Sequence, residues 1–60
     1  MSNISQIVKD LLRNDDVENY ESPEAVAESV TSELEGKMEI TPNDAAIIGE
    51  VCEEWYASEQ

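Results

Sequence analysis

The sequence contains no histidine and only one cysteine, Cys52. A lone cysteine cannot form an internal disulfide, and the usual zinc, haem and iron–sulfur ligand sets need histidine or further thiols. The densest group of oxygen ligands, at 14–19, lacks the turn glycine and the bidentate glutamate of a calcium loop. Ser–His and Cys–His catalytic pairs are excluded as well. We therefore expect no enzyme activity, no cofactor and no metal site.

Long hydrophobic runs are also absent. The longest strictly apolar runs, such as 45–48, are far shorter than the roughly 20 residues that a membrane-spanning helix needs. Residues 1–14 contain no basic stretch followed by an uninterrupted apolar one, as a secretory signal would. The sequence predicts a soluble, cytoplasmic protein with no membrane partner.

Positive charge is scarce. Three Lys and Arg residues stand against 15 Asp and Glu residues, which gives a formal net charge of -12 over 60 residues. Such a surface repels nucleic acid and anionic lipid and attracts proteins that hold polyanions. We expect the partner to be a basic, nucleic-acid-binding protein, and we expect no direct binding to nucleic acid.

The short chain limits how large a core can form. A chain of this length buries only roughly 60% of the surface that its unfolded form exposes. Small folds usually compensate for this limited core with disulfides, with bound metals or by self-association. We therefore treat residues 1–60 as a single small acidic helical domain, for which homodimerisation is one way to complete the core.

The hydrophobic residues, 40% of the chain, recur at helical intervals. In the first segment they follow the i, i+3, i+4, i+7, i+8 pattern of an amphipathic helix at Ile4, Ile7, Val8, Leu11 and Leu12. This pattern predicts a helix over about 3–13, with Lys9 and Arg13 on its polar side. Residues 14–21 then read as an ordered linker, which Val17 and Tyr20 attach to the core.

Two further helices begin at proline. Ser22-Pro23-Glu24 and Thr41-Pro42-Asn43-Asp44 both combine a capping side chain with a proline at the first helical position. Gly36 marks the end of the second helix. The expected helices span about 23–35 and 42–57, so the fold class is an all-α, small three-helix domain. The third helix has a wide apolar stripe, centred on Ala45, Ile48, Cys52 and Trp55.

The second and third helices each carry an acidic face opposite the apolar residues. The glutamates concerned are Glu24, Glu28 and Glu35 in the second helix, and Glu50, Glu53 and Glu54 in the third. Solubility alone is the simpler explanation of such faces. Helices that serve only solubility usually mix signs, however, because Glu–Lys pairs at i, i+4 stabilise them. These two faces contain no cation.

The first hypothesis is a nucleic-acid mimic. Duplex DNA presents one charge per ~1.7 Å of axis, and helical neighbours at i, i+3 and i, i+4 lie ~5–6 Å apart, so rows of glutamate approximate a phosphate track. In size and composition the chain resembles the small acidic proteins that phages and mobile elements use against restriction, CRISPR or repair proteins, and bacterial DNA-mimic inhibitors. This hypothesis predicts a competitive inhibitor, and we expect the six glutamates to be its partner-binding residues.

The second hypothesis is a small helical module for protein–protein interaction or dimerisation, in which the acidic surface serves solubility. Its self-association surface would consist of Ile47, Val51 and Tyr56, which flank the apolar stripe of the third helix. A simpler role for Ile47 and Val51 is to face Val17 and Tyr20 of the linker. The sequence leaves both hypotheses open.

Overall fold

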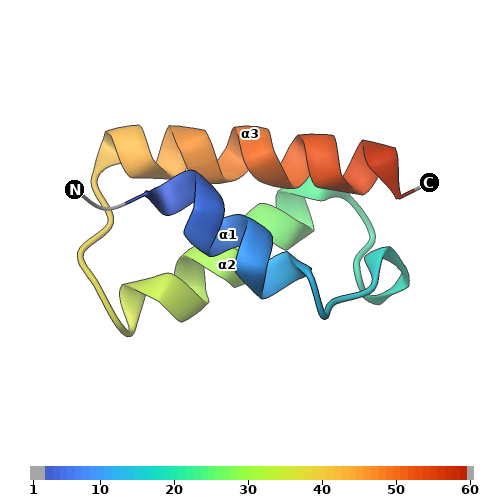
Figure 1. The fold of residues 1–60 in the computed structure, drawn as a ribbon, viewed down its shortest axis with the longest axis horizontal. Coiled ribbons are helices and arrows are strands. Elements are labelled where there is room, and N and C mark those ends of the chain that lie inside the picture. Colours follow the sequence, from blue (N-terminus) through green and yellow to red (C-terminus); the bar gives the residue numbers. More distant parts are fainter. Residues whose placement is uncertain (1–2, 60) are drawn as a thin grey trace.

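Three helices make up the fold. The computed structural model describes residues 3–59, which form α1 (Ile4–Leu12), a short 3-10 helix η1 (Val17–Asn19), α2 (Pro23–Glu35) and α3 (Pro42–Ser58), with no strand in that range. The all-α, three-helix prediction is confirmed, and each predicted boundary lies within one residue of the observed one. α1 and α3 run in the same direction and α2 runs opposite to both (Figure 1). No helix between residues 3 and 59 is long and apolar enough to cross a membrane.

Each helix begins where a side chain accepts a hydrogen bond from an otherwise unpaired backbone amide. The Asn3 side chain accepts from Gln6 N at 3.1 Å, and Ser22 Oγ accepts from Ala25 N at 3.3 Å. At the start of α3, Asp44 N donates to Thr41 Oγ1 at 3.1 Å while Thr41 N donates to an Asp44 carboxylate oxygen at 3.2 Å. This reciprocal pair is a capping box. These caps fix the two proline-initiated starts that the sequence predicts.

The two glycines both have right-handed backbone conformations. Gly36 ends α2 with φ -74° and ψ -13°, so the left-handed freedom that glycine offers at helix ends is not used. The last turn closes instead through the amides of Lys37 and Met38, which both donate to Leu34 O at 2.9 and 2.8 Å. Gly49 lies inside α3, where a Cβ atom would meet nothing within 4 Å. Neither position therefore requires glycine.

Replacing either glycine by alanine tests this backbone geometry. We expect Gly49→Ala to raise the free energy of unfolding by about 0.5–1 kcal/mol, because alanine loses less conformational entropy inside a helix. Gly36→Ala should be neutral or mildly stabilising, since its Cβ would lie 3.5 Å from Glu33 O, an ordinary contact. Urea denaturation followed by circular dichroism measures both changes. A loss of about 1 kcal/mol in Gly36→Ala would contradict the right-handed cap.

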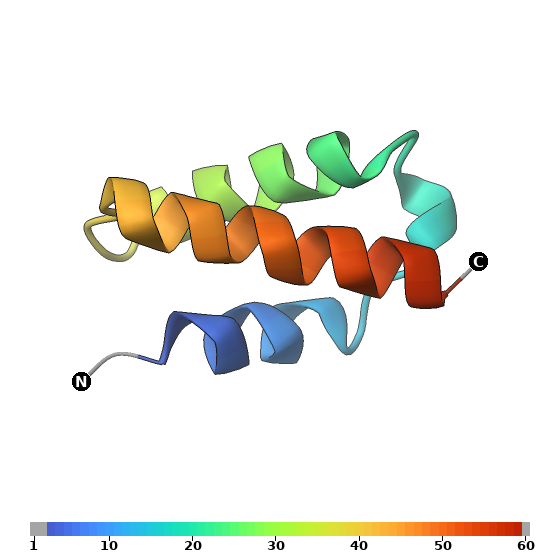
Figure 2. The same cartoon turned by 90° about the horizontal axis from the view of Figure 1, so that it is seen from above.

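The core lies where α3 packs against both α1 and α2 (Figure 2). Each helix contributes three buried apolar residues, and these are Ile4, Val8 and Leu12 in α1, Val26, Val30 and Leu34 in α2, and Ile48, Val51 and Cys52 in α3. Within each helix these three residues lie on one face, and the nine residues together form one cluster. A single chain therefore forms a continuous core.

The buried stripe of α3 is displaced from the predicted one. Ala45, expected at its centre, is exposed, whereas Val51, expected on its flank, is buried. The reason is tertiary: α1 packs along the Val51 side of α3, and Ala45 lies on the other side, beside α2. Trp55, also expected at the centre, is only half-buried against the core.

The linker between α1 and α2 is ordered, as predicted. The Tyr20 hydroxyl donates to the Asp15 carboxylate, and the Tyr20 ring meets Trp55 edge-on, with ring centroids 6.3 Å apart and planes at 82°. The hydrogen bond from Tyr20, aided by those from Asn19 and the Asp16 amide, lowers the pKa of Asp15, although partial burial opposes the shift. The same bond, together with burial, raises the pKa of Tyr20. The aromatic contact thus holds the linker to α3, and the charge-assisted hydrogen bond closes the linker on itself.

Tyr20→Phe separates the hydrogen bond from the ring contact. We expect it to lower the free energy of unfolding by about 1 kcal/mol at neutral pH, because only the hydroxyl is lost. A carboxylate with a lowered folded-state pKa stabilises the fold above its unfolded pKa, and this contribution disappears as the pH falls through the folded pKa. The difference between Tyr20→Phe and the wild type should therefore shrink in acid. Denaturant unfolding at several pH values measures it, and a pH-independent difference would contradict this role of Asp15.

Candidate functional site

The six glutamates predicted to bind a partner all lie along two adjoining grooves, and all six are exposed. The first, the α2/α3 groove, lies between those helices, has a volume of about 470 Å³ and is lined by Pro23, Glu24, Ala27, Ala45, Ala46, Gly49, Glu50, Glu53 and Glu54. It brings a glutamate of α2 together with all three predicted glutamates of α3. Residues from two helices that are distant in the sequence thus share one surface.

The second groove runs along α2 and has a volume of about 450 Å³. Its lining residues are Glu24, Ala27, Glu28, Thr31, Ser32 and Glu35, so it shares Glu24 and Ala27 with the α2/α3 groove. We call the six glutamates of both grooves the acidic surface. It extends from the outer face of α2 across to the exposed side of α3.

Small residues form the apolar part of the α2/α3 groove. Ala27 of α2 faces Ala46 and Gly49 of α3, and nothing lies within 4 Å of the position where a Gly49 Cβ would be. Because these side chains are short, the glutamates around them project beyond the groove floor. The groove therefore combines an apolar floor of small residues with surrounding carboxylates.

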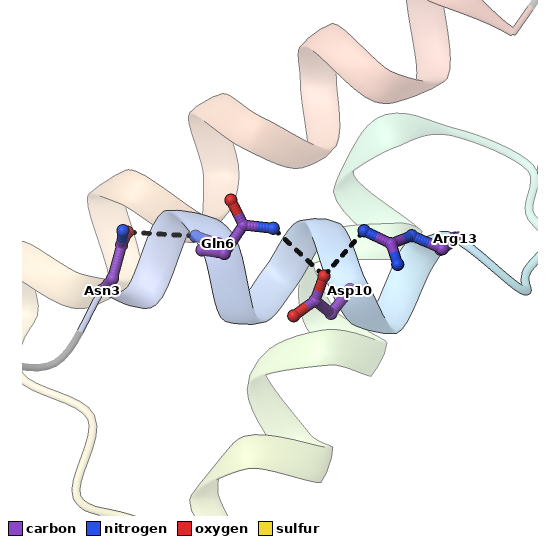
Figure 3. Close-up of polar contacts among 4 residues, drawn as sticks. All are labelled: Asn3, Gln6, Asp10 and Arg13. Carbon is purple, nitrogen blue, oxygen red and sulfur yellow. Dashed lines mark hydrogen bonds and ion pairs between the residues drawn. The ribbon is translucent and has the colours of Figure 1, made fainter.

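No cation neutralises the acidic surface within the described range. Between residues 3 and 59 the one ion pair joins Arg13 to Asp10, with N and O 3.1 Å apart; Asp10 lies on α1 and Arg13 directly follows its last residue. Figure 3 shows how Asp10 also accepts a hydrogen bond from the Gln6 side chain at 3.1 Å, so this polar cluster stays on α1. No ion pair in that range therefore offsets the charge of the acidic surface, which solvent and salt screen.

The three residues predicted for self-association take part in the core of the single chain. Val51 is buried, and Ile47 and Tyr56 are half-buried and pack against the core. Part of their apolar area is therefore already buried within the single chain.

A third groove lies between α1 and α3, and the sequence pattern did not predict it. This α1/α3 groove has a volume of about 510 Å³ and is lined by Gln6, Lys9, Leu12, Arg13, Val51, Glu54, Trp55 and Ser58. The signal in the sequence was the pair Lys9 and Arg13, one turn apart on the first helix. That this pair would face Trp55 depends on the side of α3 that α1 covers, and helical periodicity does not determine that side.

The thiol of Cys52 lies inside the core and has no exposed area. Burial raises its pKa to about 11 because the thiolate would be poorly solvated. The group is therefore protonated at neutral pH and behaves as a small apolar side chain.

Comparison of the chain with models of protein families, with curated proteins and with solved structures found no match.

Proposed function

We propose that this chain is an acidic nucleic-acid mimic that inhibits a basic, nucleic-acid-binding protein by occupying its nucleic-acid-binding site. One observation carries the proposal: six exposed glutamates from two helices line two adjoining grooves, and no cation pairs with them within residues 3–59. The target would use the lysines and arginines that normally contact phosphates. Inhibition is then competitive and weakens as salt rises.

The arrangement of the carboxylates supports mimicry over solubility. Glu24 and Glu28 are one turn apart, as are Glu50 and Glu54, and like charges at this spacing destabilise a helix by about 0.2–0.5 kcal/mol per pair. Lysine at half of these positions would give a soluble surface without that cost. A polyanion-binding partner gains from the repulsive arrangement, because bringing its cations to the surface relieves the repulsion.

The size and composition also suit an inhibitor encoded by a phage or mobile element, with a restriction enzyme, a CRISPR effector or a similar protein as the target. Such targets hold nucleic acid in positively charged channels or clefts. The proposal places the chain in the cytoplasm with its target. High charge gives fast association, and the small residues of the α2/α3 groove add shape selectivity.

Affinity capture with a matched control tests the proposal. The test variant carries Glu24→Lys, Glu28→Lys and Glu35→Lys, which changes the net charge from -12 to -6 because each reversal adds two. The control carries Glu18→Lys, Glu39→Lys and Glu59→Lys, three exposed positions outside the acidic surface, and has the same net charge. Circular dichroism first verifies that both variants fold.

We expect the wild type and the control to retain the same nucleic-acid-binding protein from a lysate and to release it at moderate salt. The acidic-surface variant should retain roughly tenfold less, since three exposed interactions of several tenths of a kcal/mol each sum to about 1.4 kcal/mol. Equal retention by the acidic-surface variant and the wild type would contradict the proposal. Equal loss in both variants would show that net charge, and not this surface, determines binding.

A further inference from the structure

The α1/α3 groove combines apolar area with charges of both signs, unlike the acidic surface. Its floor is formed by Leu12, Val51 and the half-buried Trp55. A partly exposed tryptophan is unusual on so polar a surface and is typical of the centre of a protein–protein interface. The groove therefore has the apolar centre that a docking surface needs.

The two walls of this groove differ in charge. Lys9 and Arg13 lie on the α1 wall, and Glu54 lies on the α3 wall. Two of the three cations in the chain are thus in one groove. Arg13 is paired with Asp10, but both side chains are largely exposed, at 71% and 56%, so that pair is weak and the guanidinium can accept a second carboxylate.

The direction of the helices makes these walls self-complementary. α1 and α3 run in the same direction (Figure 1), and the cations and Glu54 line the two walls of the same groove. Rotation by 180° about an axis parallel to the groove exchanges the two walls and keeps every residue at its own level along it. The cations of one copy would then face Glu54 of the other, and the two Trp55 rings would meet near the axis.

We propose that the α1/α3 groove is a homodimer interface, occupied by a second copy of this chain that is related by a two-fold axis along the groove. This inference goes beyond the proposed function and does not depend on it. A second copy is the occupant favoured by charge complementarity, because the same groove supplies both the cations and the carboxylate that match them. Self-association also suits a chain of 60 residues without a disulfide.

The large net charge opposes dimerisation less than its size suggests. Glu28 and Glu35 lie on α2 and line neither groove of α3, and α2 and α1 flank opposite sides of α3 (Figure 2). Charges farther apart than the Debye length, ~8 Å at physiological salt, are largely screened. A standard interface buries roughly 800 Å² per partner, about a fifth of the 4182 Å² accessible surface of this chain. Eight residues line the groove, against roughly 20–30 per side in a standard interface, so we expect a weak dimer that dissociates on dilution.

Sedimentation equilibrium between micromolar and millimolar protein, at physiological salt, tests the interface. We expect Lys9→Glu and Glu54→Lys each to weaken dimerisation roughly tenfold, since each reversal places like charges opposite one another twice per dimer. The double variant keeps the net charge of the wild type and restores opposite charges at positions 9 and 54, so its dimer should be stronger than that of Glu54→Lys alone. Glu28→Lys, on α2, should not weaken the dimer.

The direction in which Glu54→Lys changes the dimer affinity distinguishes the proposed interface from general charge repulsion. It lowers the net negative charge, so a dimer limited only by general repulsion would become stronger, whereas the proposed interface becomes weaker. Trp55, the single tryptophan, provides a second readout, because its emission should shift to the blue as wild-type protein is concentrated. A wild type that stays monomeric throughout, or a dimer that neither single reversal weakens, would overturn the proposal.

Discussion

Burial of the inner face of α3 against α1 and α2 is the interaction on which the rest of the structure depends. Ile48 and Cys52 have no exposed area, and both lie on that face. With a single buried thiol there is no disulfide to hold the helices, so apolar contact must do so. Because α3 uses one side for α1 and the other for α2, its remaining outer strip is where Glu50, Glu53 and Glu54 project.

The same packing determines where the charge lies. α2 buries Val26, Val30 and Leu34, which turns its glutamates outward and beside those of α3. A small core yields only a modest free energy of unfolding, and concentrated like charge reduces it further. This like charge lies on α2 and α3, whereas charges of both signs lie on α1 and at its C-terminal end, at Lys9, Asp10 and Arg13. The asymmetry separates a purely acidic side from a mixed one, and each suits a different kind of contact.

Helix boundaries were predictable because their determinants are local: Ser22, Thr41 and the two prolines specify starts through capping and ring geometry. Helical periodicity is also a local property, and it predicted that the six glutamates point outward. The joining of those glutamates in adjoining grooves, the exposure of Ala45 and the α1/α3 groove were not predictable. They depend on which side of α3 each neighbour covers, and that is a property of packing among all three helices.

The most direct test of mimicry uses the purified target protein and asks whether the chain and nucleic acid exclude one another. Fluorescently labelled nucleic acid bound to the target is titrated with this chain while anisotropy is followed. The account predicts complete displacement, with an apparent affinity for the chain that falls in proportion as nucleic acid is added. A ternary complex, in which the target holds the chain and the labelled nucleic acid together, would contradict it.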